Sequence, residues 1–563
     1  MPVELNLGTT VAAVAARLPD RSAVAQGEKV LTYRSLVDRA TRFAGFLGAH
    51  GLRVTAERVA LAGHQAGQHR LAQYLHNGPE YLEGMLGSYL ARVAPFNVNY
   101  RYRHAELGHL LGDAEPSVVQ YHARFAATLG PVVDELAHRP LLVRVEDGSG
   151  AEPLPGSFDY EQLLAEAPRP PATEPSPDDL YMIYTGGTTG MPKGVLWRQA
   201  DVAVSTLGIR NRRTGREWES LEQLLAELPP KPRRVLPCAP LMHGAAQWAA
   251  LQTLCDGGTV VFPEQADGFD ADRVLTAVAR HRVHATTLVG DAFARPLIEA
   301  VERGEHDVSS LRVVVSGGAA LHPGNKRRLM ELVPGLRVLE NIGSSESGIQ
   351  GSQHSEQPNA TGPAEFEPGG STVVASADLT RFLEPGHEGA GWLATLGRIP
   401  LGYLGDPDKT ARTFPVVAGV RVSIPGDRAR LLPSGRIQLL GRDSMTINTG
   451  GEKVYTEEVE AVLKDHPGVA DALVCGRPSE RWGAEVAALV VAAEQPAAAE
   501  LSARLTEFCR TRLSSYKVPK ALLFTERIER GPSGKPDYRW AAAQLTHTGN
   551  RGPEPVHTGS GDR

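Results

Sequence analysis

Short runs of β-branched and other apolar residues alternate along much of the chain with longer segments of helical spacing. The runs at 58–63 (RVALAG), 258–262 (GTVVF) and 311–317 (LRVVVSG) predict strands. The segment at 34–51 has helical periodicity and predicts a helix that ends at Gly51. Because strands alternate with helices in this way in parallel α/β units, the pattern predicts a large layered α/β domain.

The pattern changes after a predicted strand that ends at Arg442. A glycine-rich loop and a charged helix follow, then two strand candidates at 471–476 and 485–493 and a helix at 499–513. About one hundred residues with this α+β pattern are typical of one small domain. The last stretch has almost no apolar residues, which predicts a disordered tail. The expected organisation is therefore an N-terminal domain (1–442), a C-terminal domain (443–545) and a tail (546–563).

Three stretches lack regular patterning. The Pro-rich segment 167–179 predicts an extended connector. The His- and Gln-rich segment 63–73 and the polar segment 353–370 predict surface loops.

Composition and charge narrow the functional classes. The chain has 563 residues, of which 42% are hydrophobic and 22% charged, and its net charge of −6 argues against a nucleic-acid partner. No run of 18 apolar residues predicts a membrane span, and the N-terminus does not have the pattern of a secretory signal. The four cysteines have no metal-ligand spacing, so we expect reduced thiols in a cytoplasmic enzyme.

The segment YTGGTTGMPKG (184–194) combines permissive backbone positions with hydroxyls and a cation. Glycines let the backbone approach a ligand closely, and successive backbone N–H groups form a nest for anions. Threonine hydroxyls and Lys193 add donors and charge, which suits a polyphosphate. The segment is not a Walker A motif, because Gly194 follows Lys193 where that motif has Ser or Thr. The alternative is a flexible surface hairpin.

This segment closely resembles the phosphate loop of the adenylate-forming (ANL) superfamily, which includes acyl-CoA synthetases, luciferases and peptide-synthetase adenylation domains. Seven further segments resemble that family's motifs in the family's order, so the resemblance spans nearly the whole chain. They are PLMHGAAQW (240–248), SGGAAL (316–321), NIGSSESG (341–348), GYLGDPDKTARTF (402–414), PGDRARLLPSGRIQLLGRDS (425–444), NTGGEKVYTEEVE (448–460) and GPSGKPDYR (531–539).

The resemblance implies the ANL fold, with a small mobile C-terminal domain, and an AMP-forming acid–thiol ligase. A carboxylate attacks the α-phosphorus of ATP to give acyl-AMP and pyrophosphate, and the thiol of coenzyme A then captures the acyl group. Catalysis of the first step is mainly positioning and charge neutralisation.

The resemblance also implies which residues bind the nucleotide. Asp427 and Arg442 are expected at the ribose hydroxyls, with a surface ion pair as the alternative. Two positions depart from the family pattern: Ile342 replaces the usual Tyr, which alters the adenine contact, and Ser345 replaces Thr but keeps the hydroxyl. The full set is Thr185, Gly186, Gly187, Thr188, Thr189, Gly190, Lys193, Gly318, Ala319, Asn341, Ile342, Gly343, Ser344, Ser345, Asp427 and Arg442.

Three residues carry the implied chemistry. Lys535 is expected to bring its ammonium group to the α-phosphate, against the alternative of a solvated surface lysine. Glu346 is expected to hold Mg²⁺, because this ion needs only one or two carboxylates besides phosphate oxygens and waters. His243 is expected on the carboxylate side of the site, although a lone histidine is as readily structural.

The C-terminal motifs imply a domain rotation between the two half-reactions. Asp443 resembles the family's hinge residue, and hinges absorb large dihedral changes at a few positions. After rotation, Gly450, Gly451, Glu452 and Lys453 would contact coenzyme A.

The acyl pocket is expected around Trp248, Gly290, Gly318 and Gly343, where small residues leave room for a bulky group. No Asp lies between Cys238 and Leu254 to pair a substrate ammonium, which argues against an amino acid. The motif variants resemble actinobacterial ligases that act on steroid side-chain and similar polycyclic acids. The expected partner is thus a small-molecule carboxylic acid with a hydrophobic body, for example a polycyclic steroid or terpenoid acid.

Three alternatives stay open from the sequence. The acceptor could be a carrier-protein thiol instead of coenzyme A, though coenzyme A is favoured. The enzyme could perform one half-reaction only. A silent nucleotide-binding module is disfavoured because Lys535, Glu346 and Asp427 are all retained. A homodimer is compatible with the sequence.

Overall fold

The chain folds into two compact units, seen in a computed structural model that describes residues 2–168, 174–185, 191–357, 365–442, 445–449, 452–479, 483–494, 498–513, 515–530 and 535–547. The N-terminal unit comprises Met1–His387, Leu393–Pro425 and Leu431–Ile437. The C-terminal unit comprises Glu388–Trp392, Gly426–Arg430 and Gln438–Arg563. The expected fold class, a large α/β domain with a smaller α+β domain, is confirmed. The domain boundary at 442 and the tail from 546 stay predictions.

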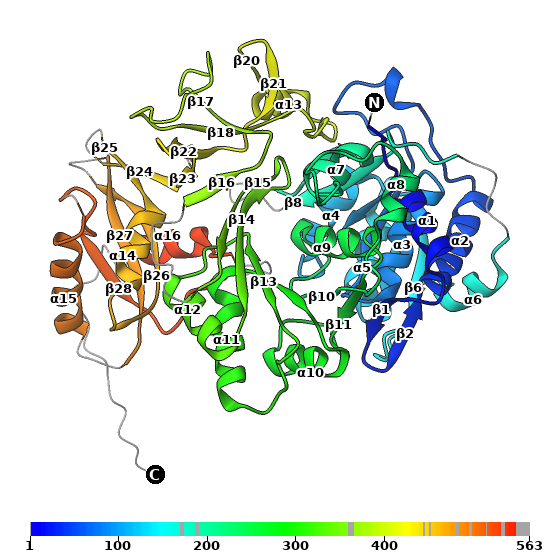
Figure 1. Cartoon of the computed structure of the whole chain (residues 1–563), viewed down its shortest axis with the longest axis horizontal. Helices are drawn as coiled ribbons and strands as arrows, with labels where there is room; N and C mark the ends of the chain where they lie inside the picture. The colour runs from blue at the N-terminus through cyan, green and yellow to red at the C-terminus, as the bar shows by residue number, and fades with distance from the viewer. Residues whose placement is uncertain are drawn as a thin grey trace. The chain divides into compact units, whose positions relative to one another are not determined.

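The first sheet of the N-terminal unit has a parallel core. Its order is β2-β1-β11-β10-β12-β13-β14-β15-β16, and every pair from β1 to β14 is parallel. Strands β13 and β14 run side by side in Figure 1. The strands predicted at 258–262 and 311–317 are confirmed as β11 and β13. The bounds are β1 (Ser22–Gln26), β2 (Lys29–Thr32), β10 (Arg234–Pro237), β11 (Thr259–Phe262), β12 (Ala285–Leu288), β13 (Val313–Gly317), β14 (Arg337–Ser344), β15 (Gly348–Ser355) and β16 (Glu365–Pro368).

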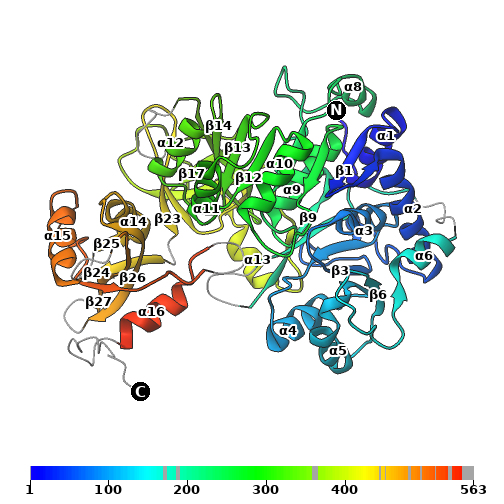
Figure 2. The ribbon, with the colours of Figure 1, turned by 90° about the horizontal axis from the view of Figure 1, so that it is seen from below.

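The second sheet is wholly parallel, in the order β4-β3-β5-β6-β7. This is the 2-1-3-4-5 order of doubly wound sheets, in which polar groups gather beyond the carboxyl ends of the strands. Helices α4 and α5 lie on one side of this sheet and α3 lies on the other (Figure 2). The bounds are β3 (Arg70–Tyr74), β4 (Ala94–Asn97), β5 (Val118–His122), β6 (Leu141–Val145) and β7 (Phe158–Asp159).

Helices connect and cover these strands. The helix predicted at 34–51 is confirmed as α2, which ends in front of Gly51 with φ +74°. The bounds are α1 (Leu7–Arg17), α2 (Tyr33–Ala49), α3 (Pro79–Leu90), α4 (His104–Ala114), α5 (Ala126–Glu135), α6 (Tyr160–Glu166), α7 (Gln199–Ser205), α8 (Leu221–Ala226), α9 (Gly244–Cys255), α10 (Ala271–His281), α11 (Gly290–Arg303), α12 (Pro323–Leu332) and α13 (Pro407–Thr413).

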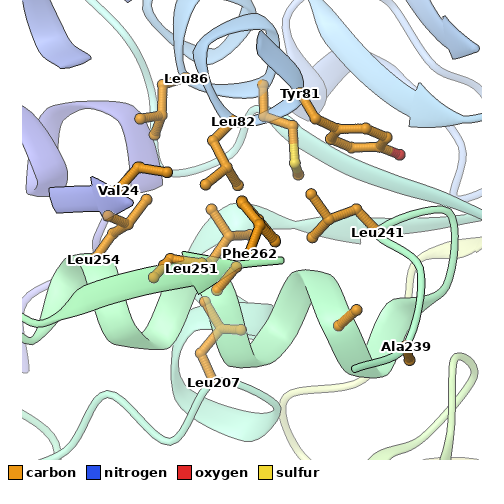
Figure 3. Packing of buried hydrophobic residues seen from close by; sticks show 14 of the residues in the cluster. Val24, Tyr81, Leu82, Leu86, Leu207, Ala239, Leu241, Leu251, Leu254 and Phe262 are labelled. Carbon is orange, nitrogen blue, oxygen red and sulfur yellow. The ribbon is translucent and has the colours of Figure 1, made fainter. Parts of the chain in front are cut away.

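The main hydrophobic core joins the two sheets. Figure 3 shows Leu82 and Leu86 of α3 facing Leu251 and Leu254 of α9 beside Phe262 of β11. All five side chains are fully or almost fully buried. Burial of each such side chain contributes about 1.5–3 kcal/mol, so this layer fixes the two sheets against each other.

A third, smaller sheet carries the Gly/Thr motif. It consists of β19 (Gly402–Tyr403), β9 (Lys193–Arg198) and β8 (Leu180–Thr185), all antiparallel. The same unit also contains β17 (Thr372–Ala375), β18 (Gly391–Leu396), β20 (Val416–Val417) and β21 (Val420–Ser423).

The C-terminal unit is built on the sheet β25-β24-β27-β26, with β28 added beside β27. Helices α14 and α15 pack on one hydrophobic cluster of this sheet and α16 packs on another. The strands predicted at 471–476 and 485–493 and the helix predicted at 499–513 are confirmed. The bounds are β22 (Asp427–Leu431), β23 (Ile437–Arg442), β24 (Thr446–Thr449), β25 (Glu452–Tyr455), α14 (Thr456–Lys464), β26 (Val469–Ser479), β27 (Gly483–Ala492), α15 (Ala498–Arg510), β28 (Ala521–Phe524) and α16 (Tyr538–His547).

Three local predictions are wrong. The run 58–63 is no strand: Arg58–Ala60 forms a 3-10 turn and Val59 is 96% exposed. The segment predicted as a loop at 63–73 contains most of β3, an interior strand of the second sheet that pairs with β4 and β5. The loop predicted at 353–370 contains the end of β15 and all of β16, while residues 358–364 lie outside the described chain.

Two further features concern the cysteines and membrane-spanning helices. All four cysteines are buried and free. Within the described residues, no helix combines the length and the apolar character needed to cross a bilayer.

Candidate functional site

The Gly/Thr motif is held by a hairpin. Strands β8 and β9 pair in an antiparallel register that places Thr185 opposite Lys193. The chain therefore leaves and re-enters this sheet at adjacent positions, as a ligand-binding loop on a rigid support requires. The predicted nucleotide ligands Gly186, Gly187, Thr188, Thr189 and Gly190 lie outside the described residues.

Lys193 at the start of β9 forms an ion pair with Asp406. Asp406 is also the N-cap of α13, where its side chain accepts a hydrogen bond from Lys409 N at 2.9 Å. The hydrogen bond from Lys193, together with that backbone N–H, lowers the pKa of Asp406. Lys193 is thus a charged group fixed opposite Thr185, where the chain re-enters the sheet after the Gly/Thr motif.

Glu346 lies in the tight turn between β14 and β15. Gly348 closes the turn with φ +69°, which favours glycine. A Cβ at Gly343 would lie 2.1 Å from the Gly348 carbonyl oxygen, so this strand pair admits no side chain there. The glycines of this motif therefore shape the turn that presents Glu346. This is a packing reason for Gly343, and its predicted place in the acyl pocket stays a prediction.

The Glu346 carboxylate faces a short segment that also carries Asp406. Tyr403 Oη donates to Glu346 Oε1 at 3.0 Å, and Lys409 Nζ lies 4.2 Å from the centre of the Tyr403 ring. Burial lowers the pKa of Lys409, and the charge of Glu346 opposes that shift. Among the described residues no group donates a hydrogen bond to Glu346 Oε2, so this oxygen fits the single-carboxylate requirement of Mg²⁺.

The segment 402–410 therefore connects two of the predicted motifs. It pairs with β9 through Tyr403 and Val195, contacts Lys193 through Asp406 and contacts Glu346 through Tyr403. The structure thus brings together a cation and a carboxylate that lie more than 150 positions apart in the chain. Sequence reasoning identified this segment as a family motif but gave Tyr403, Asp406 and Lys409 no role.

Two buried asparagines fix the segments around the Gly/Thr motif, and sequence reasoning missed both. Asn97, at the carboxyl end of β4, accepts from Tyr184 N (2.8 Å) and donates to Tyr184 O (2.9 Å) and Met242 O (2.6 Å). Asn77, just after β3, accepts from Leu241 N and donates to Ala239 O. A polar residue directly after an apolar strand was the available signal.

The acyl-side motif forms the start of α9. His243 is the N-cap residue of this helix and is half-buried. Trp248 donates to Tyr181 Oη at 3.1 Å, and a Cβ at Gly244 would lie 3.1 Å from the Trp248 ring. Gly244 is thus needed for the close approach of this indole.

The other predicted residues of the N-terminal unit lie at the carboxyl ends of β12 to β14. Gly290 has φ +52° and packs on residues 319–320, because its Cβ would lie 2.3 Å from Ala320 O. Gly318 and Ala319 directly follow β13, and Asn341 pairs with Gly317. Ile342, Ser344 and Ser345 are half-buried in the same hairpin, where Ser345 O accepts from the Trp197 indole at 2.8 Å.

The predicted residues of the C-terminal unit form a separate set. Asp427 begins β22 and Arg442 ends β23. Glu452 and Lys453 begin β25 and pair with Thr449 and Asn448, so the expected loop is shorter than 448–453. Gly450, Gly451 and the expected hinge residue Asp443 lie outside the described residues.

Lys535 is exposed, and described residues on both sides of it are anchored in the C-terminal unit. Before it, Arg530 donates to Asp471 at 2.5 Å and forms a β-bridge with Pro536. After it, Asp537 N donates to Glu529 O at 2.9 Å. This anchoring confines the position of the Lys535 backbone within its unit. The residues of the C-terminal unit are not assigned to a common site with Glu346, and their roles stay predictions.

Comparison with known proteins identifies the class. The profile of the AMP-binding enzyme family matches residues 11–390, and that of the AMP-binding enzyme C-terminal domain matches residues 458–535. The chain belongs to the AMP-binding enzyme family, so the resemblance inferred from the motifs is confirmed. The enzyme class expected from the sequence, an ATP-dependent acid–thiol ligase, is confirmed with it.

The curated relatives span almost the full chain. The medium-chain acyl-CoA ligase Mig of Mycobacterium avium is 49% identical over 95% of this chain and 97% of its own length. A medium/long-chain-fatty-acid–CoA/3-oxocholest-4-en-26-oate–CoA ligase of Mycobacterium tuberculosis is 38% identical over 99% of both chains. The 3-oxocholest-4-en-26-oate–CoA ligase of Rhodococcus rhodochrous is 37% identical over 96% of both.

Solved structures confirm the fold. The anthranilate CoA ligase AuaEII in complex with anthranoyl-AMP has a TM-score of 0.79 at 19% identity and covers 98% of this chain and 99% of its own. ATP-bound MatB from Rhodopseudomonas palustris has a TM-score of 0.76 at 24% identity and covers 96% and 99%. At these identities the likeness concerns the fold alone.

Proposed function

We propose that this enzyme joins a hydrophobic monocarboxylic acid to coenzyme A through an acyl-AMP intermediate, with ATP and Mg²⁺. The substrate range proposed is medium-chain fatty acids and acids with a polycyclic body, such as steroid side-chain acids. The names of the three relatives support both ends of this range. We further propose that the enzyme is cytoplasmic.

The observation that carries the proposal is the joint placement of Lys193 and Glu346 around the segment 402–410. A fixed ammonium group suits the negative charge of a triphosphate, which it neutralises. A carboxylate oxygen that accepts no hydrogen bond from a described residue suits the metal ion. Bound Mg²⁺ would supply further neutralisation of the charge that develops on the phosphoryl group. Lys193, Glu346 and the backbone of the turn at 344–347 would do the positioning.

The remaining predicted residues receive roles within this proposal. Thr185 to Gly190, Gly318, Ala319, Asn341 to Ser345, Asp427 and Arg442 bind the nucleotide. His243 and Trp248 face the acid, and Gly290, Gly318 and Gly343 border its pocket. Asp443 is the hinge, and Gly450 to Lys453 contact coenzyme A.

Lys535 is proposed to stabilise the α-phosphate during adenylation. Lys535→Ala should abolish acid-dependent exchange of pyrophosphate into ATP while leaving the unfolding transition unchanged, because the side chain is exposed. Lys520→Ala is the matched control: Lys520 is an exposed lysine of the same unit that hydrogen-bonds Ser515 O. Exchange that survives in the Lys535 variant as in the control would exclude this role.

Substrate and acceptor are tested on the wild type. AMP release is measured with C8–C12 fatty acids, aryl acids, steroid side-chain acids and diterpenoid acids, with coenzyme A or a carrier-protein thiol as acceptor. The proposal predicts fastest turnover with an aliphatic or polycyclic acid and coenzyme A. Faster turnover with aryl acids or with the carrier protein would contradict it. Thioester formation from supplied acyl-AMP without pyrophosphate exchange would favour the one-half-reaction alternative.

A further inference from the structure

Parallel strands of the first sheet begin with positively charged residues at one common edge. Val235, Ala285 and Val313 lie opposite one another in β10, β12 and β13, and Val313 lies opposite Arg337 of β14. The residues just before the first three strands therefore also form a line. The basic row, as we define it, comprises Arg233, Arg234, Arg282, His284, Arg312 and Arg337.

Backbone hydrogen bonds fix the spacing of this row. His284 N donates to Arg234 O and Arg312 N donates to His284 O, each at 2.9 Å. Neighbouring strands lie about 4.8 Å apart, so the row from β10 to β14 spans about 14 Å over three strand spacings. The row is part of the sheet edge itself and does not depend on long loops.

The arginines of the row lack close acidic partners within the described chain. None of its five arginines forms an ion pair with a described residue, whereas the neighbouring Arg212 pairs with Asp256. Burial, and then the four surrounding arginines, lower the pKa of His284, so the histidine adds no charge near neutral pH. Two acidic groups lie nearby. Asp256 pairs with Arg212, and its charge also opposes the lowering of the pKa of Arg233. Arg282 helps to lower the pKa of Asp307.

The row is open to solvent. All of its members are exposed except Arg234, which is half-buried and donates to His281 O at 2.9 Å. It lies at the amino ends of the strands, while Gly290 and Gly318 follow the carboxyl ends of β12 and β13. The basic row is therefore at the opposite edge of the sheet from the proposed nucleotide residues, and the proposed reaction does not use it.

A cluster of five arginines without close acidic partners among the described residues is unexpected on a chain with 65 acidic and 59 basic residues. The basic row is longer than the diameter of a single phosphate group. Its length fits a surface that presents several anions side by side. Proteins that bind single-stranded nucleic acid combine such charge with aromatic residues for base stacking. The segments that carry the row, 229–234, 281–284, 308–312 and 333–337, contain no Phe, Tyr or Trp.

We propose that the basic row docks the enzyme on the surface of a bilayer that contains anionic lipids. The choice of a bilayer rests on the proposed function, because a hydrophobic carboxylic acid partitions into membranes and adds negative charge there. The row would hold the enzyme near its substrate by electrostatic attraction, without insertion of any segment. Such attraction is screened by salt over about 10 Å at 0.1 M.

The test is co-sedimentation of the full-length enzyme with vesicles, without acid or ATP. Phosphatidylcholine vesicles with 30% phosphatidylglycerol are compared with pure phosphatidylcholine, at 50 and 500 mM salt. The test variant is Arg233→Gln/Arg282→Gln/Arg337→Gln, since these three side chains make no hydrogen bond or ion pair with a described residue. Each arginine near an anionic surface is worth about fivefold in affinity, so the variant should bind about a hundredfold more weakly.

A matched control separates this row from net charge. Arg42→Gln/Arg139→Gln/Arg510→Gln removes the same charge from exposed arginines outside the row and should bind like the wild type. Thermal unfolding checks that both variants fold.

Four results would overturn the proposal: equal binding of the wild type to both vesicle types, unchanged binding of the row variant, equal loss in the control, or binding of an oligonucleotide at 150 mM salt without binding of vesicles. Vesicle binding is measured without turnover. The enzyme can therefore fail to bind vesicles and still be a ligase, or bind vesicles and lack the proposed ligase activity.

Discussion

Asn97 offers the sharpest test of how the fold supports the Gly/Thr motif. Its side chain makes three hydrogen bonds, two with the backbone of Tyr184, which precedes the motif, and one with Met242 O. Asn97 is only 3% exposed, so water does not replace these bonds when the side chain is removed. At about 1 kcal/mol net for each bond, Asn97→Ala should lower the free energy of unfolding by about 3 kcal/mol.

The assay is urea unfolding followed by tryptophan fluorescence, with pyrophosphate exchange measured on the same samples. The variant should also show a raised KM for ATP, because Tyr184 and Thr185 support one end of the loop. Asn99→Ala is the matched control: Asn99 is half-buried and accepts from Arg101 N at 3.0 Å. The reasoning is refuted if Asn97→Ala loses less than about 1 kcal/mol or behaves like the control.

Three further predictions concern charge, backbone and pH. Glu346→Gln should lower pyrophosphate exchange by about a hundredfold, since it removes a charge from the proposed metal ligand; a rate within threefold of wild type would exclude that role. Gly343→Ala should destabilise the hairpin and reduce adenylation, because its Cβ would lie 2.1 Å from Gly348 O, whereas Gly268→Ala meets nothing within 4 Å and should be silent. Burial lowers the pKa of His76 to about 4 from 6.5, so the unfolded chain takes up this proton first and stability falls as pH drops from about 6.5 to 4. The loss from this group is up to about 3 kcal/mol, and unfolding of His76→Phe should depend less on pH over that range; an equal dependence would contradict the assignment.

The sequence predicts the fold class and much of the architecture because its apolar residues recur with strand or helix spacing over long segments. Runs such as 258–262 are buried at every position, so their composition alone indicates a strand. The run 58–63 is also rich in apolar residues, but it pairs with no described strand and its Val59 is exposed. A pattern records which residues are apolar and not whether a neighbour covers them.

The missed strand β3 shows the opposite case. Its segment contains polar residues, among them Gln73, which is buried and donates to Tyr81 O at 2.8 Å and to Gln120 at 3.2 Å. Gln120 lies 47 positions away, so the sequence gives no sign that this polar side chain is satisfied. Burial of a polar residue depends on such distant partners.

The candidate site also has a part that the sequence predicts and a part that only the fold shows. The motifs allowed Lys193 and Glu346 to be named in advance, because glycine-rich turns and charged residues have local signatures. The contacts of these residues with Asp406 and Tyr403 required the fold, since they join positions far apart in the chain. Asn97 was missed because its one local signal, a polar residue at the end of an apolar strand, does not show which backbone groups it binds.

The most direct test of the central claim follows an oxygen atom. The enzyme is given ATP, coenzyme A and a C8–C12 fatty acid whose carboxylate carries ¹⁸O, and the released AMP is analysed by mass spectrometry. If the carboxylate attacks the α-phosphorus and the thiol then displaces AMP from the acyl carbon, AMP carries one ¹⁸O atom from the acid. Unlabelled AMP, or release of ADP and phosphate in its place, would contradict the account.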